Sequence, residues 1–110
     1  VLTHMPLIED EPVDFGMVEF CHACLKCAVD CPAKAISFKG PEVFNGLLQW
    51  RHQDAKCMEM WMNLETGCGI CMHSCPFSHG VDPELTAGMK GNKNIILEIL
   101  SMDDEKRKIP

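Results

Sequence analysis

Residues 21–32 read Cys-His-Ala-Cys-Leu-Lys-Cys-Ala-Val-Asp-Cys-Pro, and this stretch decides the fold of the chain. Two residues separate each of the first three cysteines from the next, three residues precede the fourth, and a proline follows it. Cysteines three apart in a tight loop can present their sulfur atoms to one inorganic centre, whereas the fourth, turned by the proline, points elsewhere. The stretch therefore predicts a metal-binding loop whose last cysteine serves a neighbouring site.

A second group of cysteines follows the same order, with its first member moved upstream. Cys57 stands alone, and the remaining three are spaced by two and three residues and end again in Cys-Pro. This internal repeat predicts a pseudo-symmetric pair of sites. Two 4Fe-4S clusters fit the pattern, because in two-cluster bacterial ferredoxins the Cys-Pro cysteine of each run binds the other cluster.

Crossed ligation of this kind gives every cysteine a role. We predict that one cluster is bound by Cys21, Cys24, Cys27 and Cys75. The other cluster is then bound by Cys31, Cys57, Cys68 and Cys71. Zinc and a disulfide framework are the alternatives. The spacing favours clusters over both, because zinc sites rarely place three cysteines at successive three-residue steps, and cysteines three apart bridge poorly.

Size and charge set the limits for these sites. A chain of 110 residues buries only about two-thirds of its unfolded surface, so we expect folding to depend on the clusters. The net charge is −6 before any cluster is bound, which argues against nucleic acid as a partner. No secretory signal and no apolar run of membrane-spanning length is visible in the sequence.

The segments between the cysteines predict an α+β fold, a two-cluster bacterial-ferredoxin-like domain with short strands, small helices and a C-terminal helix. Residues 35–39 alternate apolar and polar side chains, which predicts a strand. Residues 45–64 mix leucine, methionine and tryptophan with charged residues, which predicts helical pieces packed against the clusters. Asn92 is placed to cap the last helix. The apolar face of that helix comprises Ile95, Ile96, Ile99, Leu100 and Met102.

Three parts are expected along the chain. Residues 1–18, interrupted by prolines, form a linker; residues 19–82 form the two-cluster domain; residues 83–110 form a C-terminal helical tail. The charged run 103–108 predicts a solvated end.

The remaining apolar and aromatic residues predict packing rather than chemistry. Trp50 and Trp61 could line an electron route or a cofactor cavity, but the favoured expectation is that they close a small core. The histidines could relay protons or ligate metal, but eight cysteines already complete two clusters, so the histidines are expected to be packed or exposed. A shell of apolar side chains is expected to exclude water from the clusters. Its predicted members are Val29, Ile36, Phe38 and Ile70.

The residues that flank the cysteines resemble those of a known family. The matching segments are Pro12–Cys21, Trp50, Cys57, Trp61 and Gly67–Ser78. They are similar to the iron-sulfur domain of corrinoid-dependent reductive dehalogenases, and the resemblance extends over most of the chain, up to His79. The related epoxyqueuosine reductases share the architecture.

That resemblance implies a role inside an enzyme of anaerobic respiration. In the family, two clusters deliver electrons singly from a low-potential donor to a corrinoid, which removes halide from an organohalide. The corrinoid-binding domain lies upstream, so residues 1–18 would lead from it. The family's catalytic tyrosine is absent because the chain contains no Tyr, and we expect this chain alone not to be catalytic. The resemblance further implies a membrane anchor protein as partner and a peripheral location on the outer face of the cytoplasmic membrane.

Two other functions fit the ligand pattern. A free-standing ferredoxin-type carrier is one, and its surface should then be self-sufficient. The iron-sulfur part of an epoxyqueuosine-reductase-like enzyme is the other. The proline-rich lead, the tryptophan pair and the helix after Asn92 are unnecessary in a free-standing carrier, so they favour a segment of a larger enzyme.

Overall fold

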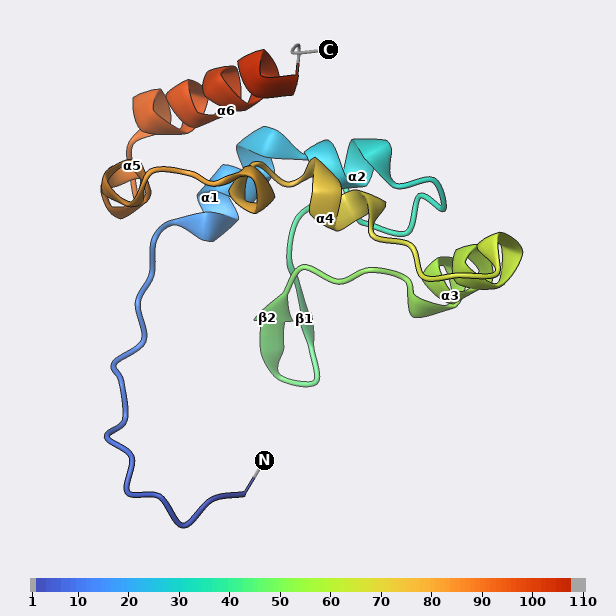
Figure 1. Ribbon diagram of the computed structural model, residues 1–110, viewed down its shortest axis with the longest axis horizontal. Helices are drawn as coiled ribbons and strands as arrows, with labels where there is room; N and C mark the ends of the chain where they lie inside the picture. The colour runs from blue at the N-terminus through green and yellow to red at the C-terminus, as the bar shows by residue number, and fades with distance from the viewer. Residues whose placement is uncertain (1, 108–110) are drawn as a thin grey trace.

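The computed structural model describes residues 2–107, and short helices and one hairpin follow one another along the chain (Figure 1). In chain order the elements are α1 (Met17–Cys24), α2 (Lys26–Asp30), β1 (Glu42–Phe44), β2 (Leu47–Gln49), α3 (Asp54–Leu64), α4 (Ile70–Ser74), the 3-10 helix η1 (Pro76–His79), α5 (Pro83–Gly88) and α6 (Lys93–Arg107). Short helices with a two-stranded sheet and a C-terminal helix confirm the predicted α+β class. Within residues 2–107, no helix has the length and apolar character needed to cross a membrane.

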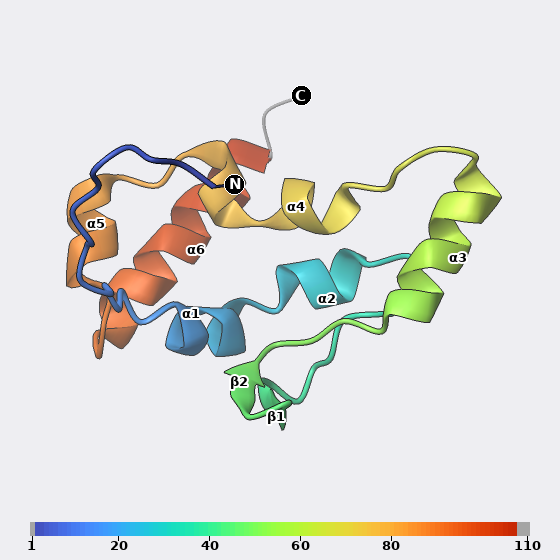
Figure 2. The same ribbon diagram turned by 90° about the horizontal axis from the view of Figure 1, so that it is seen from below.

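The two short helices α2 and α4 lie side by side at the centre of the molecule (Figures 1 and 2). Both end at a Cys-Pro step: Cys31 has φ −59° and ψ 115°, and Cys75 has φ −73° and ψ 125°. A residue that precedes proline is pushed out of the helical region, so both helices stop at the equivalent cysteine. The repeat in the sequence is therefore also a repeat of the backbone.

The hydrophobic core lies beneath α6 rather than between the cysteine groups. Its buried members are Phe20, Met89, Ile96 and Ile99. The Asn92 side-chain oxygen accepts hydrogen bonds from the backbone N–H groups of Asn94 at 3.1 Å and Ile95 at 3.4 Å. The predicted cap and the buried face of the last helix are thus confirmed, although Met102 at the end of that face is exposed.

The two strands form a hairpin joined by a two-residue turn. Val43 lies opposite Leu48 in the antiparallel register, and the turn residues Asn45 and Gly46 have φ values of 51° and 80°. Positive φ at both central positions is the mark of a type I′ turn, which Asn-Gly favours. The hairpin extends away from the central helices (Figure 1).

The strand and helix predictions for this region need correction. The strand predicted at residues 35–39 is wrong, because only Ile36 forms a bridge, with His52, and no neighbouring strand continues the pairing. The helical prediction for residues 45–64 is wrong at Leu47–Gln49, which pair in the hairpin, and is confirmed for Asp54–Leu64.

Helix α3 stands apart from the other elements, at the edge of the molecule (Figures 1 and 2). None of its residues is buried. In the described part of the chain, its backbone comes close to no other helix or strand. The helix carries Cys57 in its first turn.

The sequence predicts a solvated end for the charged run 103–108, but the structure places part of this run in a helix and buries Asp103. Helix α6 continues to Arg107 and carries Asp103 into a buried position, where only 4% of its surface is exposed. The carboxylate pairs there with Lys26, a distant partner that local sequence does not reveal. Lys108, the last residue of the predicted run, lies outside the described residues.

Replacing Ile99 by alanine should lower the free energy of unfolding by about 2–5 kcal/mol, because it empties a buried position in the core. Leu97→Ala is the matched control on the same helix: its side chain is 61% exposed, and the loss should stay below about 0.5 kcal/mol. Thermal unfolding followed by circular dichroism measures both. Equal losses in the two variants would contradict the position of the core beneath α6.

Candidate metal centre

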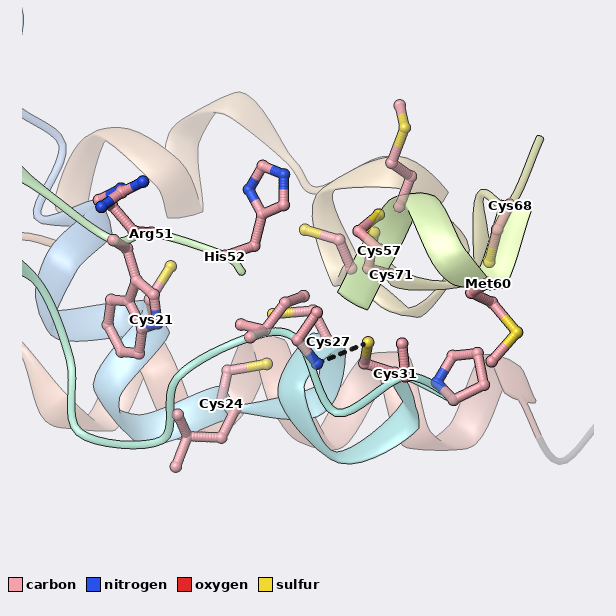
Figure 3. A pocket seen from close by; sticks show the side chains of 18 of the residues that line it. Cys21, Cys24, Cys27, Cys31, Arg51, His52, Cys57, Met60, Cys68 and Cys71 are labelled. Atoms are coloured by element: carbon pink, nitrogen blue, oxygen red, sulfur yellow. Dashed lines mark hydrogen bonds between the residues drawn. The ribbon is translucent and has the colours of Figure 1, made fainter. Parts of the chain in front are cut away.

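All eight cysteines line one cavity of about 430 Å³ (Figure 3). In Figure 3, Cys21 and Cys24 lie towards one end of the cavity, and Cys57, Cys68 and Cys71 lie towards the other. Each cysteine is a free thiol and is half-buried or buried. The fold therefore brings together every residue that the sequence predicts as a ligand.

Cys75 lies next to the thiols of the first run, although it belongs to the second group. Burial raises the pKa of the Cys21 thiol, and three neighbouring thiols raise it further. These neighbours are Cys27, Cys24 and Cys75. Burial also raises the pKa of Cys24, against the backbone N–H and the ammonium of Lys26, which lower it. Because their pKa is raised, the Cys21 and Cys24 thiols stay protonated near neutral pH. Binding of iron would therefore have to displace these protons.

The arrangement of the sulfur atoms suits a cluster with several metal atoms. The eight cysteines line the cavity from α1, α2, α3 and α4 and from the segments next to them. A 4Fe-4S cluster presents its iron atoms at separate corners, so its thiolate ligands surround it without meeting at a point. The donor set and the spread of the donors therefore fit such clusters.

Hydrogen bonds fix some of these sulfur atoms and helices in place. The backbone N–H of Ala35 donates to Cys31 Sγ at 3.4 Å, drawn dashed in Figure 3. Ser74 Oγ donates to Asp30 Oδ2 at 2.6 Å. Ser74 and Asp30 hold equivalent places in the two repeats, each one residue before the Cys-Pro step, so this bond joins α2 to α4.

The wall between the cysteines is largely apolar. Trp50, Met60 and Trp61 line it, so the two tryptophans that the sequence assigned to an ordinary core face the cavity instead. Such a wall limits the access of water to a cluster.

Of the four residues predicted for an apolar shell, Ile36 lines the cavity. The prediction is wrong for Val29, Phe38 and Ile70, which are 56%, 52% and 42% exposed. For Val29 the reason is geometric: Cys27 and Cys31 are four residues apart and share one side of α2, and Val29 lies midway between them on the other side.

Arg51 and His52 also line the cavity and were missed by the sequence analysis. The guanidinium of Arg51 lies 3.6 Å above the ring of Phe44, and His52 Nε2 lies 3.0 Å from Asp54 Oδ1. The bridge between His52 and Ile36 brings this segment to the cavity. No periodic pattern in the sequence could have signalled a contact made by one residue pair.

His22, which lies in α1 between the first two cysteines, is packed between residues that flank the hairpin on both sides. Its ring centroid lies 4.9 Å from that of Trp50, whose Nε1 donates to the Ser37 carbonyl at 2.8 Å. On the other side, a Cβ atom on Gly40 would lie only 2.4 Å from His22 Cε1. Gly40 also has φ +99°, which side chains rarely adopt. The residues that flank the hairpin on both sides, Gly40 and Trp50, are thus packed against α1 between its two cysteines.

A ferredoxin-like fold with eight free thiols around one cavity defines a two-cluster iron-sulfur domain. Comparison with known families agrees: the model of the 4Fe-4S dicluster domain matches residues 20–79, and the chain belongs to that family.

The relatives of this chain include reductive dehalogenases, as the flanking residues predict. Tetrachloroethene reductive dehalogenase of Sulfurospirillum multivorans is 45% identical over 87 residues, which are 73% of this chain and 17% of that protein. The solved catabolic reductive dehalogenase NpRdhA superposes with a TM-score of 0.76 at 34% identity, covering 92% of this chain and 15% of that one. The family resemblance is confirmed, and this chain is an iron-sulfur electron-transfer domain of reductive dehalogenase-like proteins.

A second kind of enzyme shares the similarity. Epoxyqueuosine reductase of Lactococcus garvieae is 31% identical over 101 residues, which are 78% of this chain and 28% of that protein. The chain spans less than a fifth of the length of the dehalogenases named above and less than a third of this reductase.

Gly40→Ala should displace His22 and disturb α1 between Cys21 and Cys24, because the added methyl group would overlap the imidazole ring. Gly46→Ala is the matched control, since Gly46 also has positive φ but no atom lies within 4 Å of its added Cβ. Both variants carry the backbone cost of about 1–2 kcal/mol for a left-handed residue. Iron content after anaerobic reconstitution should fall only for Gly40→Ala; an equal fall in both would contradict the His22 contact.

Proposed function

We propose that this chain carries electrons one at a time, through two 4Fe-4S clusters, to a corrinoid in a reductive dehalogenase that removes halide from an organohalide. The observation that carries the proposal is the single cavity lined by all eight cysteines, in a chain whose relatives are dehalogenases. The corrinoid would be held by a separate corrinoid-binding domain of the same enzyme. A low-potential donor would supply the electrons.

The proposed ligands of one cluster are Cys21, Cys24, Cys27 and Cys75. Those of the other are Cys31, Cys57, Cys68 and Cys71. The position of Cys75 beside the first run supports this crossed assignment. When bound, a 4Fe-4S cluster supplies one-electron transfer. The chain contributes the thiolates, the hydrogen bond to Cys31 and an apolar wall.

The exposed apolar side chains of the hairpin support the proposal that this chain is a segment of a larger enzyme. Four of its apolar side chains are between 41% and 72% exposed. They are Val43, Phe44, Leu47 and Leu48. Val43 lies opposite Leu48 and Phe44 opposite Leu47, so the two pairs lie on opposite faces of the hairpin, and both faces expose apolar side chains. Such exposure is typical of a contact with another protein surface, whereas a free-standing carrier would need a self-sufficient surface. We propose that the corrinoid-binding domain covers the hairpin.

An epoxyqueuosine-reductase-like enzyme is the second candidate, favoured by the similarity to the Lactococcus garvieae protein. The two candidates differ in the reaction rather than in the clusters. Halide release from chlorinated ethenes and reduction of epoxyqueuosine, assayed on the same corrinoid-loaded protein, separate them. Activity only towards epoxyqueuosine would replace the dehalogenase proposal and leave the cluster assignment intact.

Anaerobic reconstitution should give about eight iron and eight sulfide per chain, with a broad absorption band near ~400 nm that bleaches on reduction. The eight free thiols around one cavity are the reason for this expectation. Iron and sulfide analysis with visible spectroscopy measures it. A colourless protein that carries zinc or no metal would overturn both the cluster assignment and the function proposed from it.

Removing one ligand should damage one cluster and spare the other. Cys24→Ala should affect the cluster assigned to the first run, and Cys71→Ala the other, so each variant is the control for its counterpart. Electron paramagnetic resonance of the reduced protein resolves which signal is lost, and halide release should fall in both variants. Iron that stays near ~8 per chain in either variant would contradict the ligand assignment.

A further inference from the structure

Lys26, in the middle of the first cysteine run, forms ion pairs with two carboxylates of α6. Its Nζ lies 2.5 Å from Asp103 Oδ2 and 2.7 Å from Asp104 Oδ1. The Lys26 side chain is 20% exposed, Asp103 is 4% exposed and Asp104 is 59% exposed. This contact joins the first residue of α2, between two predicted ligands, to the last turns of α6.

The burial of Asp103 is costly for the fold. A carboxylate that loses its water must be paired, and a buried ion pair often adds little to stability compared with apolar side chains of similar size. The apolar face of α6 already holds that helix on the core through Ile96 and Ile99. The ion pair adds a charged contact to this apolar packing, and it lies beside the cysteine run.

Lys26 lies between Cys24 and Cys27, two cysteines assigned to the same cluster. Burial disfavours its charge, but the hydrogen bonds to Asp103 and Asp104 outweigh this and raise the pKa of Lys26, so the ammonium stays charged. Lys26 directly precedes Cys27 and follows Cys24 by two residues, so its charge lies beside two proposed ligands.

We propose that the charge of Lys26, partly offset by the carboxylates of Asp103 and Asp104, sets the reduction potential of the cluster bound by the first run. The inference rests on the proposed function and adds a control of potential to it. One-electron reduction of a bound cluster by the low-potential donor adds one negative charge. A nearby ammonium stabilises the reduced form and raises the potential, whereas nearby carboxylates lower it.

The test is a redox titration of the anaerobically purified, cluster-loaded protein, followed by electron paramagnetic resonance. Lys26→Met should shift one of the two midpoint potentials downwards, and Asp103→Asn should shift the same potential upwards. Lys26→Arg keeps the charge and should retain the original value. The second midpoint potential is an internal control and should move less in every variant.

Lys90→Met is the matched surface control. Lys90 Nζ lies 2.9 Å from Asp14 Oδ2 in an exposed pair outside the cysteine runs, so the variant makes the same change in net charge away from the ligands. Its effect on either potential should be smaller than that of Lys26→Met, because exposed charges are screened by water and salt.

Opposite shifts from Lys26→Met and Asp103→Asn separate the electrostatic role from a purely structural one, which would move both variants in the same direction. Shifts of the same sign, or shifts no larger than that of Lys90→Met, would overturn the inference while the clusters stay bound. If Lys26→Met or Asp103→Asn loses iron, the test uses Asp104→Asn, which leaves the Lys26–Asp103 pair in place. An upward shift of the midpoint potential in Asp104→Asn supports the inference, and an unchanged potential overturns it. A wild-type protein without clusters would overturn the proposed function as well.

Discussion

The pairing of α2 with α4 is the contact on which the rest of the structure depends. Both helices end at a Cys-Pro step, and the bond between Ser74 and Asp30 fastens them at equivalent positions. Each helix carries one cysteine within it and one directly after it. The distance between the two helices therefore determines how the cysteines of the first run face those of the second. The proline restricts the backbone of the preceding cysteine, which makes this geometry a property of the local chain. A pseudo-symmetric cavity follows from it.

The molecule has two separate packing centres, a hydrophobic core and a cysteine-lined cavity. The hydrophobic core lies beneath α6, while the space between the cysteine groups is a cavity of about 430 Å³ lined by thiols and aromatic side chains. A domain of this size has little apolar surface to bury, so an inorganic centre can take the place of a second core. The packing of His22 against Gly40 and Trp50 then ties the hairpin to the wall of that cavity.

The sequence predicted most reliably what short-range chemistry determines. Cysteine spacing and Cys-Pro steps act over a few residues, and so does the cap at Asn92. All eight cysteines line one cavity, and the last helix begins at its predicted cap. The hairpin was also readable, since Asn45-Gly46 is a strong turn signal, but the leucines and the tryptophan after it were interpreted as a helical pattern. Asp103 and His52 could not be placed in advance, because their positions depend on Lys26 and Ile36, which are distant in the sequence.

The isolation of α3 has a consequence for how the molecule matures. Because this helix buries none of its own residues and approaches no other described helix or strand, side-chain packing contributes little to holding it in place. The proposed bond from Cys57 to iron is then its main anchor. Insertion of the cluster and docking of α3 are then one event. A molecule that loses this cluster to oxygen would release the whole eleven-residue helix, which proteases could then cleave.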